Sequence, residues 1–451
     1  MIKDKKKLKK VITYGTFDFF HKGHQALLDR AKKLGDYLIV GVTSTEYDKK
    51  RGKLNVSQSL HERIKNVETT GLADEIIVEE YDGQKVLDIQ KYGIDLFVIG
   101  SDWKKKFDYL KEYCEVKYLS RTKGISSTLI RNDSSFVKIG IIGYGNIARR
   151  FVIESKFVSN TEVTGVFGEK IKSVKKFTKK HEIKSAFDNF DNFINQIDAV
   201  YIATPHNSHF DYAKRSLIAG KHVLCEKPLT LDEKHTHELI KIAKKKGLVL
   251  MEAVKTAFCD GFNQMVSIAK SGIIGDIIHL DASFTKLISE SNVREYDQKL
   301  SGGAHNELMT YPLLAASKIL GKDVIDYNNL RYFKNSKVDI FSKLNLIYAK
   351  STANLYAGIG VKKEGNLIIS GTKGYIYCKA PWWKTAKFSI KFEKNQSINH
   401  EHAFLGDGLR YEIAEFLKCI NHKNNFSFKL NDKDMIFLSA FINANYKTIK
   451  L

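Results

Sequence analysis

The stretch FDFFHKGH sets two histidines where a β-rich run gives way to a helical pattern. His21 and His24 are spaced i, i+3, so on a helix they share one face of its first turn, whereas a zinc pair usually needs i, i+4. Gly23 lets a phosphate approach the backbone, and a helix N-terminus adds unpaired N–H groups and a partial positive charge. Two imidazoles placed there can stabilise the charge on a phosphorus atom while pyrophosphate leaves. The spacing predicts nucleotidyl transfer; the alternative is a capping histidine beside a surface one.

A second strand-to-helix turn carries the pattern G-x-G-x-x-A in GYGNIA, directly after the apolar run KIGII. Gly143 permits a tight turn and Gly145 lets a pyrophosphate approach. Ala148 allows the helix to pack closely on the strand, and Asn146 and Ile147 complete the loop. This context predicts a dinucleotide site.

The next β-rich run, EVTGVF, ends at Gly168, where an NAD site would hold its ribose-binding acid. Because Gly168 is small, it leaves room for a 2′-phosphate, which Lys170 would attract. The sequence therefore favours NADP(H). Glu169 can still serve as the ribose-binding acid, which leaves NAD(H) as the alternative.

Both motifs depend on the elements around them. β-rich runs and helical patterns alternate in the first part of the chain, with the runs at 11–14, 37–42, 75–78 and 96–99 and the helical patterns at 25–34, 60–70 and 84–92. Such alternation implies βαβ units and a parallel sheet. A second alternation covers 137–253. From residue 277 strand-like runs dominate, which suggests a largely antiparallel sheet with one open face, and a helical pattern at 408–419 closes the chain.

The expected fold class is therefore α/β. We predict a Rossmann-like nucleotidyltransferase domain over 1–131, a linker over 132–136 and a dinucleotide-binding Rossmann domain over 137–255. An α/β domain with a large open, mainly antiparallel sheet is expected over 256–451.

Composition narrows the class of protein. The 451 residues are 43% hydrophobic, as in an ordinary folded protein, and no apolar run approaches the ~20 residues of a membrane helix. The five cysteines form no CxxC pair, which argues against a disulfide framework or a zinc site. The net charge of +22 is spread along the chain and concentrates in no arginine-rich stripe, which argues against nucleic acid. A lysine-rich proteome explains the charge, which would also attract polyanionic small substrates. We expect a cytoplasmic protein without nucleic-acid or membrane partners.

The segment from VITYGTFDFF to LIVGV, together with RTKGISST, closely resembles glycerol-3-phosphate cytidylyltransferases of the HxGH nucleotidyltransferase superfamily. The resemblance covers about residues 10–131 and implies a CTP substrate, with Mg²⁺ on its phosphates and His21 and His24 as transition-state stabilisers. It implies that the CTP site is formed by Gly15, Thr16, Phe17, Gly23, Arg121, Thr122, Ser126, Ser127 and Thr128. Acceptor or phosphate contacts would come from Lys53, Arg63, Asp102 and Trp103, with Asp102 assisting Mg²⁺. Lys22 stands where the family often has tryptophan, which bears on the acceptor more than on the chemistry.

Four further segments, ATPHN, EKP, MEA and GGAHNELMTYP, together with the glycine-rich loop, resemble the Gfo/Idh/MocA oxidoreductases over about residues 137–451. The resemblance implies a catalytic Lys227, with Tyr311 where members have histidine or tyrosine and Glu307 where aspartate is usual. Tyr311 would protonate the alkoxide left by hydride delivery, and a neighbouring Lys227 ammonium would lower the pKa of Tyr311. Further cofactor contacts are implied for Ala203, Thr204, Pro205, Asn207, Glu226 and Lys227. Neither His206 nor His209 receives a role, and the family's open sheet implies a homo-oligomer, a dimer or tetramer.

The two resemblances together predict a bifunctional enzyme that makes a CDP-linked sugar alcohol from CTP, a ketose phosphate and NAD(P)H. The favoured sugars are fructose 6-phosphate, giving a CDP-glucitol or CDP-mannitol type product, and ribulose 5-phosphate, ahead of dihydroxyacetone phosphate. Such alditols feed capsule or teichoic-acid-like polymers, and either order of the two steps is open. The alternative is a glycerol-3-phosphate-type cytidylyltransferase with a non-catalytic dinucleotide-binding module for oligomerisation or regulation, which the glutamate at position 307 favours.

Overall fold

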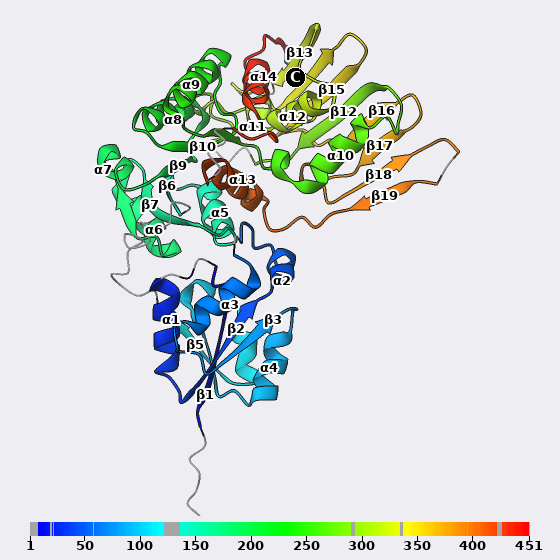
Figure 1. Cartoon of the computed structure of the whole chain (residues 1–451). Coiled ribbons are helices and arrows are strands. Elements are labelled where there is room, and N and C mark those ends of the chain that lie inside the picture. Colours follow the sequence, from blue (N-terminus) through cyan, green and yellow to red (C-terminus); the bar gives the residue numbers. More distant parts are fainter. Residues whose placement is uncertain are drawn as a thin grey trace, which may run out of the picture. The chain divides into compact units, whose positions relative to one another are not determined.

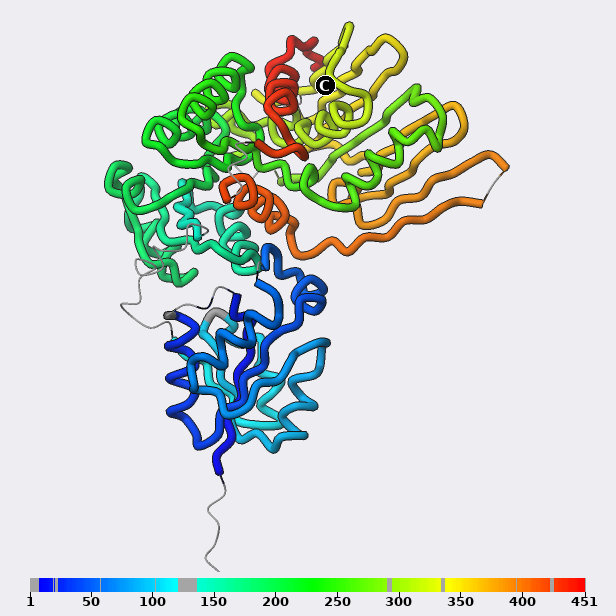
Figure 2. The backbone as a smooth tube through the Cα atoms, viewed as in Figure 1, coloured from blue at the N-terminus to red at the C-terminus, as the bar shows by residue number. Residues whose placement is uncertain are grey.

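The computed structural model describes residues 8–18, 20, 22–56, 58–120, 136–289, 294–333, 337–394, 396–421 and 426–450. The chain divides into two compact units, one of residues 1–136 with 157–160 and one of residues 137–156 with 161–451 (Figures 1 and 2). The predicted boundary at 255/256 falls inside the second unit, and most of the predicted linker lies outside the described residues.

The first unit is built on a five-stranded parallel sheet of order β3-β2-β1-β4-β5. Its strands are β1 (Lys10–Gly15), β2 (Tyr37–Thr43), β3 (Glu75–Glu79), β4 (Leu96–Gly100) and β5 (Glu115–Leu119). The strand order reverses between β1 and β4. In open sheets of this kind, ligands bind at such a switch point, beyond the carboxyl ends of the strands.

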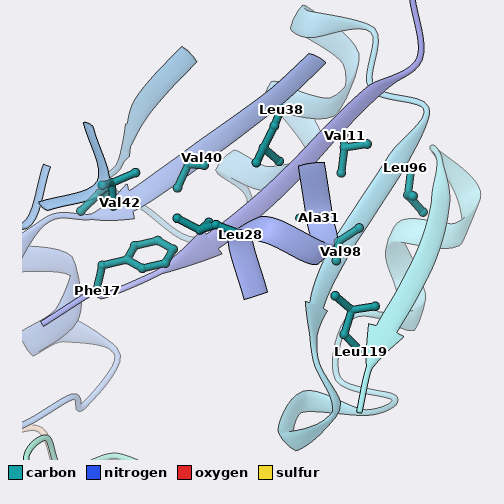
Figure 3. Packing of buried hydrophobic residues seen from close by; sticks show 11 residues of the cluster. Val11, Phe17, Leu28, Ala31, Leu38, Val40, Val42, Leu96, Val98 and Leu119 are labelled. Carbon is teal, nitrogen blue, oxygen red and sulfur yellow. The ribbon is translucent and has the colours of Figure 1, made fainter. Parts of the chain in front are cut away.

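Helices cover both faces of this sheet. They are α1 (Lys22–Lys32), α2 (Thr45–Lys50), α3 (Leu60–Glu68) and α4 (Gln84–Tyr92). On one face Leu28 and Ala31 of α1 pack with Val11, Val40 and Val98 from three strands (Figure 3). The other face carries a second cluster, to which α4 contributes. Burial of alternate strand residues on both faces explains the near-continuous apolar runs of β1 and β2.

The second unit begins with a six-stranded parallel sheet of order β11-β10-β9-β6-β7-β8. Its strands are β6 (Val137–Ile142), β7 (Thr161–Phe167), β8 (Ser185–Phe187), β9 (Ala199–Ile202), β10 (His222–Glu226) and β11 (Leu250–Ala253). The connecting helices are α5 (Asn146–Ser155), α6 (Ile171–His181), α7 (Phe190–Ile194), α8 (His209–Ile218) and α9 (Glu233–Lys246). The order reverses between β6 and β9, the arrangement of a dinucleotide-binding fold.

A nine-stranded sheet of order β19-β18-β17-β16-β12-β15-β14-β13-β20 completes this unit. Its strands are β12 (Ile277–Thr285), β13 (Asp326–Phe333), β14 (Phe341–Ile347), β15 (Thr352–Gly358), β16 (Leu367–Gly371), β17 (Tyr375–Cys378), β18 (Lys387–Lys391), β19 (Ile398–Glu401) and β20 (Lys447–Lys450). β12 pairs with β15 and β13 with β20 in parallel, and the other pairings are antiparallel. The predicted α/β fold is thus confirmed, and the large sheet is mainly antiparallel, as expected, with these two parallel pairings making it mixed.

Five helices accompany the large sheet: α10 (Asp260–Lys270), α11 (Ala304–Leu308), α12 (Thr310–Ile319), α13 (Leu409–Asn421) and α14 (Asp432–Ile442). α13 returns to the parallel sheet, where it packs against α5, β11 and the 3₁₀ turn Lys255–Phe258 (Figure 1). Within the described residues, every helix is too short or too polar to cross a bilayer.

Candidate active sites

The first candidate site lies at the carboxyl ends of β1 and β2. Thr16, the first residue after β1, donates its hydroxyl to Asp48 Oδ1 at 3.0 Å and accepts from the Arg51 guanidinium at 2.8 Å. Arg51 also pairs with Asp48 at 2.6 Å. Thr16 is therefore tied to α2 and to Arg51 at its C-terminus, and α2 is an element that the sequence did not predict.

Arg63, predicted to contact the acceptor or a phosphate, is fully buried. Its Nη1 donates to the main-chain oxygens of Thr16 at 2.9 Å and Thr43 at 2.7 Å, and it pairs with Asp48 at 3.3 Å. Arg63 thus fixes the carboxyl ends of β1 and β2 from inside the fold.

His24 packs against two aromatic rings at the start of α1. Its ring centroid is 5.3 Å from that of Phe17 and 5.5 Å from that of Phe20. Phe17 is buried and adopts a φ of 53°, an uncommon value for a residue with a side chain, which is often found at functional sites. The exposed Gly23 precedes His24. The aromatic pair orients the imidazole at the helix N-terminus.

The pKa of Lys53 is lowered to about 8, first by desolvation and then by the Arg51 guanidinium, against the opposing carboxylates of Asp48 and Asp18. Trp103, on the turn after β4, packs against the second hydrophobic cluster. The remaining predicted residues of this site lie outside the described part of the chain: His21, Arg121, Thr122, Ser126, Ser127, Thr128 and the side chain of Asp102.

The second candidate site is a cavity of about 1600 Å³ in the second unit. It brings together the predicted catalytic residues Lys227, Glu307 and Tyr311. It is also lined by the predicted cofactor residues, Ala148 excepted: Gly143, Gly145, Asn146, Ile147, Gly168, Lys170, Ala203, Thr204, Pro205, Asn207 and Glu226. Ala148 is fully buried in α5, where a small side chain allows close packing of helix on sheet.

The glycine-rich loop has the geometry of a phosphate cradle. Gly143 has a φ of 102°, and a Cβ there would lie 2.5 Å from the Ala203 oxygen. A Cβ on Gly145 would meet nothing within 4 Å, so open space faces the first turn of α5. This combination fits a pyrophosphate on the helix N-terminus.

Gly168, at the end of β7, is covered by the side chain of Tyr144. A Cβ on Gly168 would lie 2.5 Å from Tyr144 Cε1. Glu169 and Lys170 follow on the cavity wall, with Lys170 at the N-terminus of α6. The residues present here fit a dinucleotide whose ribose reaches the end of β7.

Lys227 and Glu307 form the centre of the cavity. The Lys227 ammonium donates to the main-chain oxygen of Glu307 at 2.7 Å and lies 3.8 Å from its carboxylate. The carboxylate accepts from Arg294 at 2.9 Å, while its Oε1 is buried without a hydrogen-bond partner among the described residues. The longer glutamate side chain thus reaches an arginine that the sequence reading missed.

The two unassigned histidines differ in their surroundings. His209 is fully buried, and its ring nitrogens lie 2.7 Å from the Pro228 oxygen and 3.0 Å from the Thr204 oxygen, so it ties two cavity loops together. His206 lies 3.2 Å from the Ser301 oxygen and 3.7 Å from Glu307. Burial, followed by the Lys227 charge, holds the pKa of His206 well below its ordinary value, so its ring is neutral.

The pKa of Tyr311 corrects one expectation. It is raised, first by burial and then by the carboxylates of Glu226 and Glu412, and Arg150 is the cation that opposes them. The prediction of a lowered Tyr311 pKa is therefore wrong in direction, because burial and the nearby carboxylates dominate. Tyr311 is a phenol that stays protonated.

The comparisons with known proteins divide the chain in the same way as the two sites. Residues 12–133 match the family model "Cytidylyltransferase-like", and residues 137–254 match "Oxidoreductase family, NAD-binding Rossmann fold". Over 126 residues the chain is 56% identical to the glycerol-3-phosphate cytidylyltransferase of Bacillus spizizenii, covering 28% of this chain and 97% of that protein.

The second unit has its own relatives. The dTDP-3,4-didehydro-2,6-dideoxy-alpha-D-glucose 3-reductase of Actinomadura kijaniata is 32% identical over 191 residues, which are 42% of this chain and 57% of that protein. The 3-ketoreductase KijD10 of the same organism, solved with NADP and TDP-benzene, shares the fold with a TM-score of 0.64 and 24% identity, over 70% of this chain and 99% of that one. Solved variants of KijD10 replace one tyrosine with phenylalanine and one lysine with alanine.

The chain therefore belongs to the cytidylyltransferase-like family through its first unit and to the Gfo/Idh/MocA oxidoreductases through its second, and it is a bifunctional enzyme that joins cytidylyl transfer to NAD(P)-dependent oxidoreduction.

Proposed function

We propose that the enzyme makes a CDP-linked sugar alcohol from CTP, a ketose phosphate and NADPH, for a capsule or teichoic-acid-like polymer. The observation that carries the proposal is the convergence of Lys227, Glu307 and Tyr311 on the cavity that also holds the glycine-rich loop. A non-catalytic module needs no partly buried ammonium and buried phenol in a cavity that also holds a dinucleotide loop. Fructose 6-phosphate and ribulose 5-phosphate are the favoured sugars.

In the transfer step, a phosphate oxygen of the sugar attacks the α-phosphorus of CTP and pyrophosphate leaves. His21 and His24 stabilise the charge on the reacting phosphoryl group. The aromatic contacts that orient His24 support this role. Arg121, Thr122, Ser126, Ser127 and Thr128 bind the nucleotide, and Mg²⁺ arrives with the CTP phosphates.

In the reduction step, the reduced nicotinamide supplies a hydride to the ketose carbonyl carbon. Lys227 binds the carbonyl oxygen and Tyr311 gives that oxygen its proton. Two observations support these roles: both residues line the cavity, and the lysine and tyrosine replaced in KijD10 lie as many positions apart as Lys227 and Tyr311 do here. Glu307, held by Arg294, keeps the Lys227 ammonium in place.

NADPH is the favoured cofactor because Gly168 leaves the end of β7 without a carboxylate and Lys170 follows on the cavity wall. A 2′-phosphate gains charge-assisted hydrogen bonds from such a lysine, whereas a ribose hydroxyl needs an acceptor. NADH becomes the cofactor if Glu169 takes the acceptor role.

The test is to incubate the enzyme with CTP, Mg²⁺, NADPH and each ketose phosphate in turn, and to weigh the nucleotide products by mass spectrometry. The proposal predicts a CDP-alditol, with pyrophosphate release and NADPH consumption dependent on the same sugar phosphate. Glycerol 3-phosphate as the sole efficient acceptor, with no ketose reduced, would instead support the non-catalytic module.

A further inference from the structure

Glu412 has no role in the reaction described above, yet its side chain lines the same cavity as Tyr311. It lies in the first turn of α13 and is 1% exposed. Both of its carboxylate oxygens are buried without a hydrogen-bond partner among the described residues. An unpartnered buried carboxylate is costly, so such a group normally keeps its proton.

The cations nearest to Glu412 are engaged elsewhere. Lys255 donates to the Asp407 main-chain oxygen at 2.8 Å, and Arg150 donates to the Asp407 carboxylate at 2.7 Å. Both cations therefore neutralise Glu412 only in part.

The anions around Glu412 favour its neutral form. Glu226 from β10 faces it and accepts a hydrogen bond of 2.5 Å from the Tyr201 phenol. Glu154 from α5 is paired with Arg410 at 2.8 Å. Burial first and the Glu226 charge second hold the pKa of Glu412 well above its ordinary value, against Lys255 and Arg150. Glu412 thus holds a proton in the same cavity as a phenol that must give one up.

We propose that Glu412 is a proton-relay residue that acts through Tyr311. The inference rests on the proposed reduction. When hydride reaches the carbonyl carbon, the Tyr311 O–H bond breaks and its proton goes to the alkoxide oxygen. The Glu412 O–H bond then breaks and its proton restores Tyr311 through an intervening water, because the Glu412 carboxyl oxygens make no hydrogen bond to a described side chain. The resulting carboxylate takes a proton from solvent water in the open cavity, which completes the cycle.

The surroundings of Tyr311 explain why a relay is needed. A phenolate there is opposed by burial first and by the Glu226 carboxylate second, so ionised Tyr311 is a high-energy species. A neutral carboxylic acid on the same cavity wall can return a proton to the Tyr311 phenolate soon after it forms. Glu226 is less suited to the role, because its carboxylate already accepts from Tyr201 and from the Lys227 main-chain N–H at 3.3 Å.

The test compares Glu412→Gln with Glu415→Gln in the full-length enzyme. Glu415 lies on the same helix, accepts from Ser427 at 2.6 Å and is absent from the cavity wall. E412Q cannot pass on a proton, and because general acids contribute 10²- to 10⁴-fold, we expect ketose reduction to fall roughly 10- to 100-fold for a relay. The wild-type rate should decline at high pH as Glu412 ionises, and this decline should vanish in E412Q. E415Q should match the wild type in both readouts, and all three proteins should transfer cytidylyl groups equally.

Stability separates a relay from a structural role. Replacing an unpaired buried acid with Leu relieves its desolvation cost, so Glu412→Leu should unfold at the wild-type temperature or above while losing reduction. The relay is overturned if E412Q reduces at the wild-type rate with the wild-type pH profile. It is also overturned if both variants lose reduction only in proportion to a fall in unfolding temperature. Wild-type enzyme that reduces no ketose rejects the proposed function, and the relay with it, whereas an active wild type with an equally active E412Q rejects the relay alone.

Discussion

The Lys227 ammonium donates a hydrogen bond to the main-chain oxygen of Glu307 across 2.7 Å. Lys227 follows β10 of the parallel sheet, and Glu307 lies on α11, which accompanies the large mixed sheet. The contact therefore holds the ammonium of a residue from the parallel sheet with a main-chain oxygen of a helix that accompanies the mixed sheet. An ammonium held in this way is oriented before substrate arrives, and preorganised charge is the main source of electrostatic catalysis.

Replacing Lys227 with Ala should abolish reduction and spare cytidylyl transfer. Losing one preorganised donor typically lowers turnover about 10²- to 10³-fold. The matched control is Lys234→Ala, an exposed lysine of the same unit, which should leave both activities at wild-type level. NADPH oxidation and pyrophosphate release are measured in parallel. Unchanged ketose reduction in K227A would remove Lys227 from the chemistry, whereas the absence of ketose reduction in the wild type itself would support the non-catalytic module.

His24→Ala should have the opposite effect. Loss of one imidazole donor should lower cytidylyl transfer by roughly 2.7–4 kcal/mol, about 10²- to 10³-fold, and leave NADPH oxidation with a supplied CDP-ketose unchanged. His61→Ala, an exposed histidine on α3 of the same unit, is the control. Equal transfer rates for H24A and H61A would remove His24 from the chemistry.

Gly143→Ala and Gly145→Ala should separate folding from cofactor binding. In G143A the new Cβ meets the Ala203 oxygen at a φ of 102°, so both the unfolding temperature and NADPH affinity should fall. In G145A nothing lies within 4 Å, so stability should hold while the methyl group occupies space for the pyrophosphate. Calorimetric titration and thermal unfolding measure the two effects. Equal loss of stability in G143A and G145A would contradict the conclusion that Gly143 is sterically confined and that Gly145 faces open space.

Glu252 should make the second unit less stable as pH rises. Burial raises its pKa from 4.5 to about 8, so between these values the folded chain binds a proton that the unfolded chain has released. The contribution of Glu252 to stability is therefore greatest below pH 4.5 and is lost as the pH rises to about 8, by about 5 kcal/mol in total. Glu252→Gln keeps an oxygen for the Leu229 N–H and should remove the slope.

Denaturant unfolding from pH 5 to 9 measures this slope. Glu238→Gln is the control, because Glu238 forms a surface ion pair with Lys214 and should leave the slope unchanged. The same slope in E252Q as in the wild type would show that another group carries the pH dependence.

The sequence predicted most elements whose pattern is local. The runs at 11–14 and 37–42 become β1 and β2 because both of their faces are buried. β5 was missed because it is an edge strand, EVKYL, whose charged residues face solvent. α2 was missed because its six residues carry four charges and no apolar stripe, and it is held by contacts of Asp48 and Arg51 with Thr16.

The strand pairings and helix contacts that could not be predicted from the sequence join residues far apart in the chain. The parallel pairing of β12 with β15 joins segments about 70 residues apart, and no local pattern encodes it. The helical pattern at 408–419 was predicted, but its packing on the parallel sheet, which places Glu412 on the cavity that Tyr311 also lines, was not. Arg294 and Arg63 likewise acquire their partners only through tertiary folding.

The indole of Trp383 stacks on the Phe284 ring, with centroids 3.6 Å apart, and lines the cavity of the second unit. Its neighbour Trp382 is fully buried and donates to the Ser283 oxygen at 2.9 Å, while Trp103 belongs to the first unit. Indole emission overlaps the absorption of reduced nicotinamide, so energy transfer dims the tryptophans that lie nearest to it. The tryptophan fluorescence of the second unit should therefore report binding of the reduced cofactor without an added label, even while the first unit catalyses cytidylyl transfer.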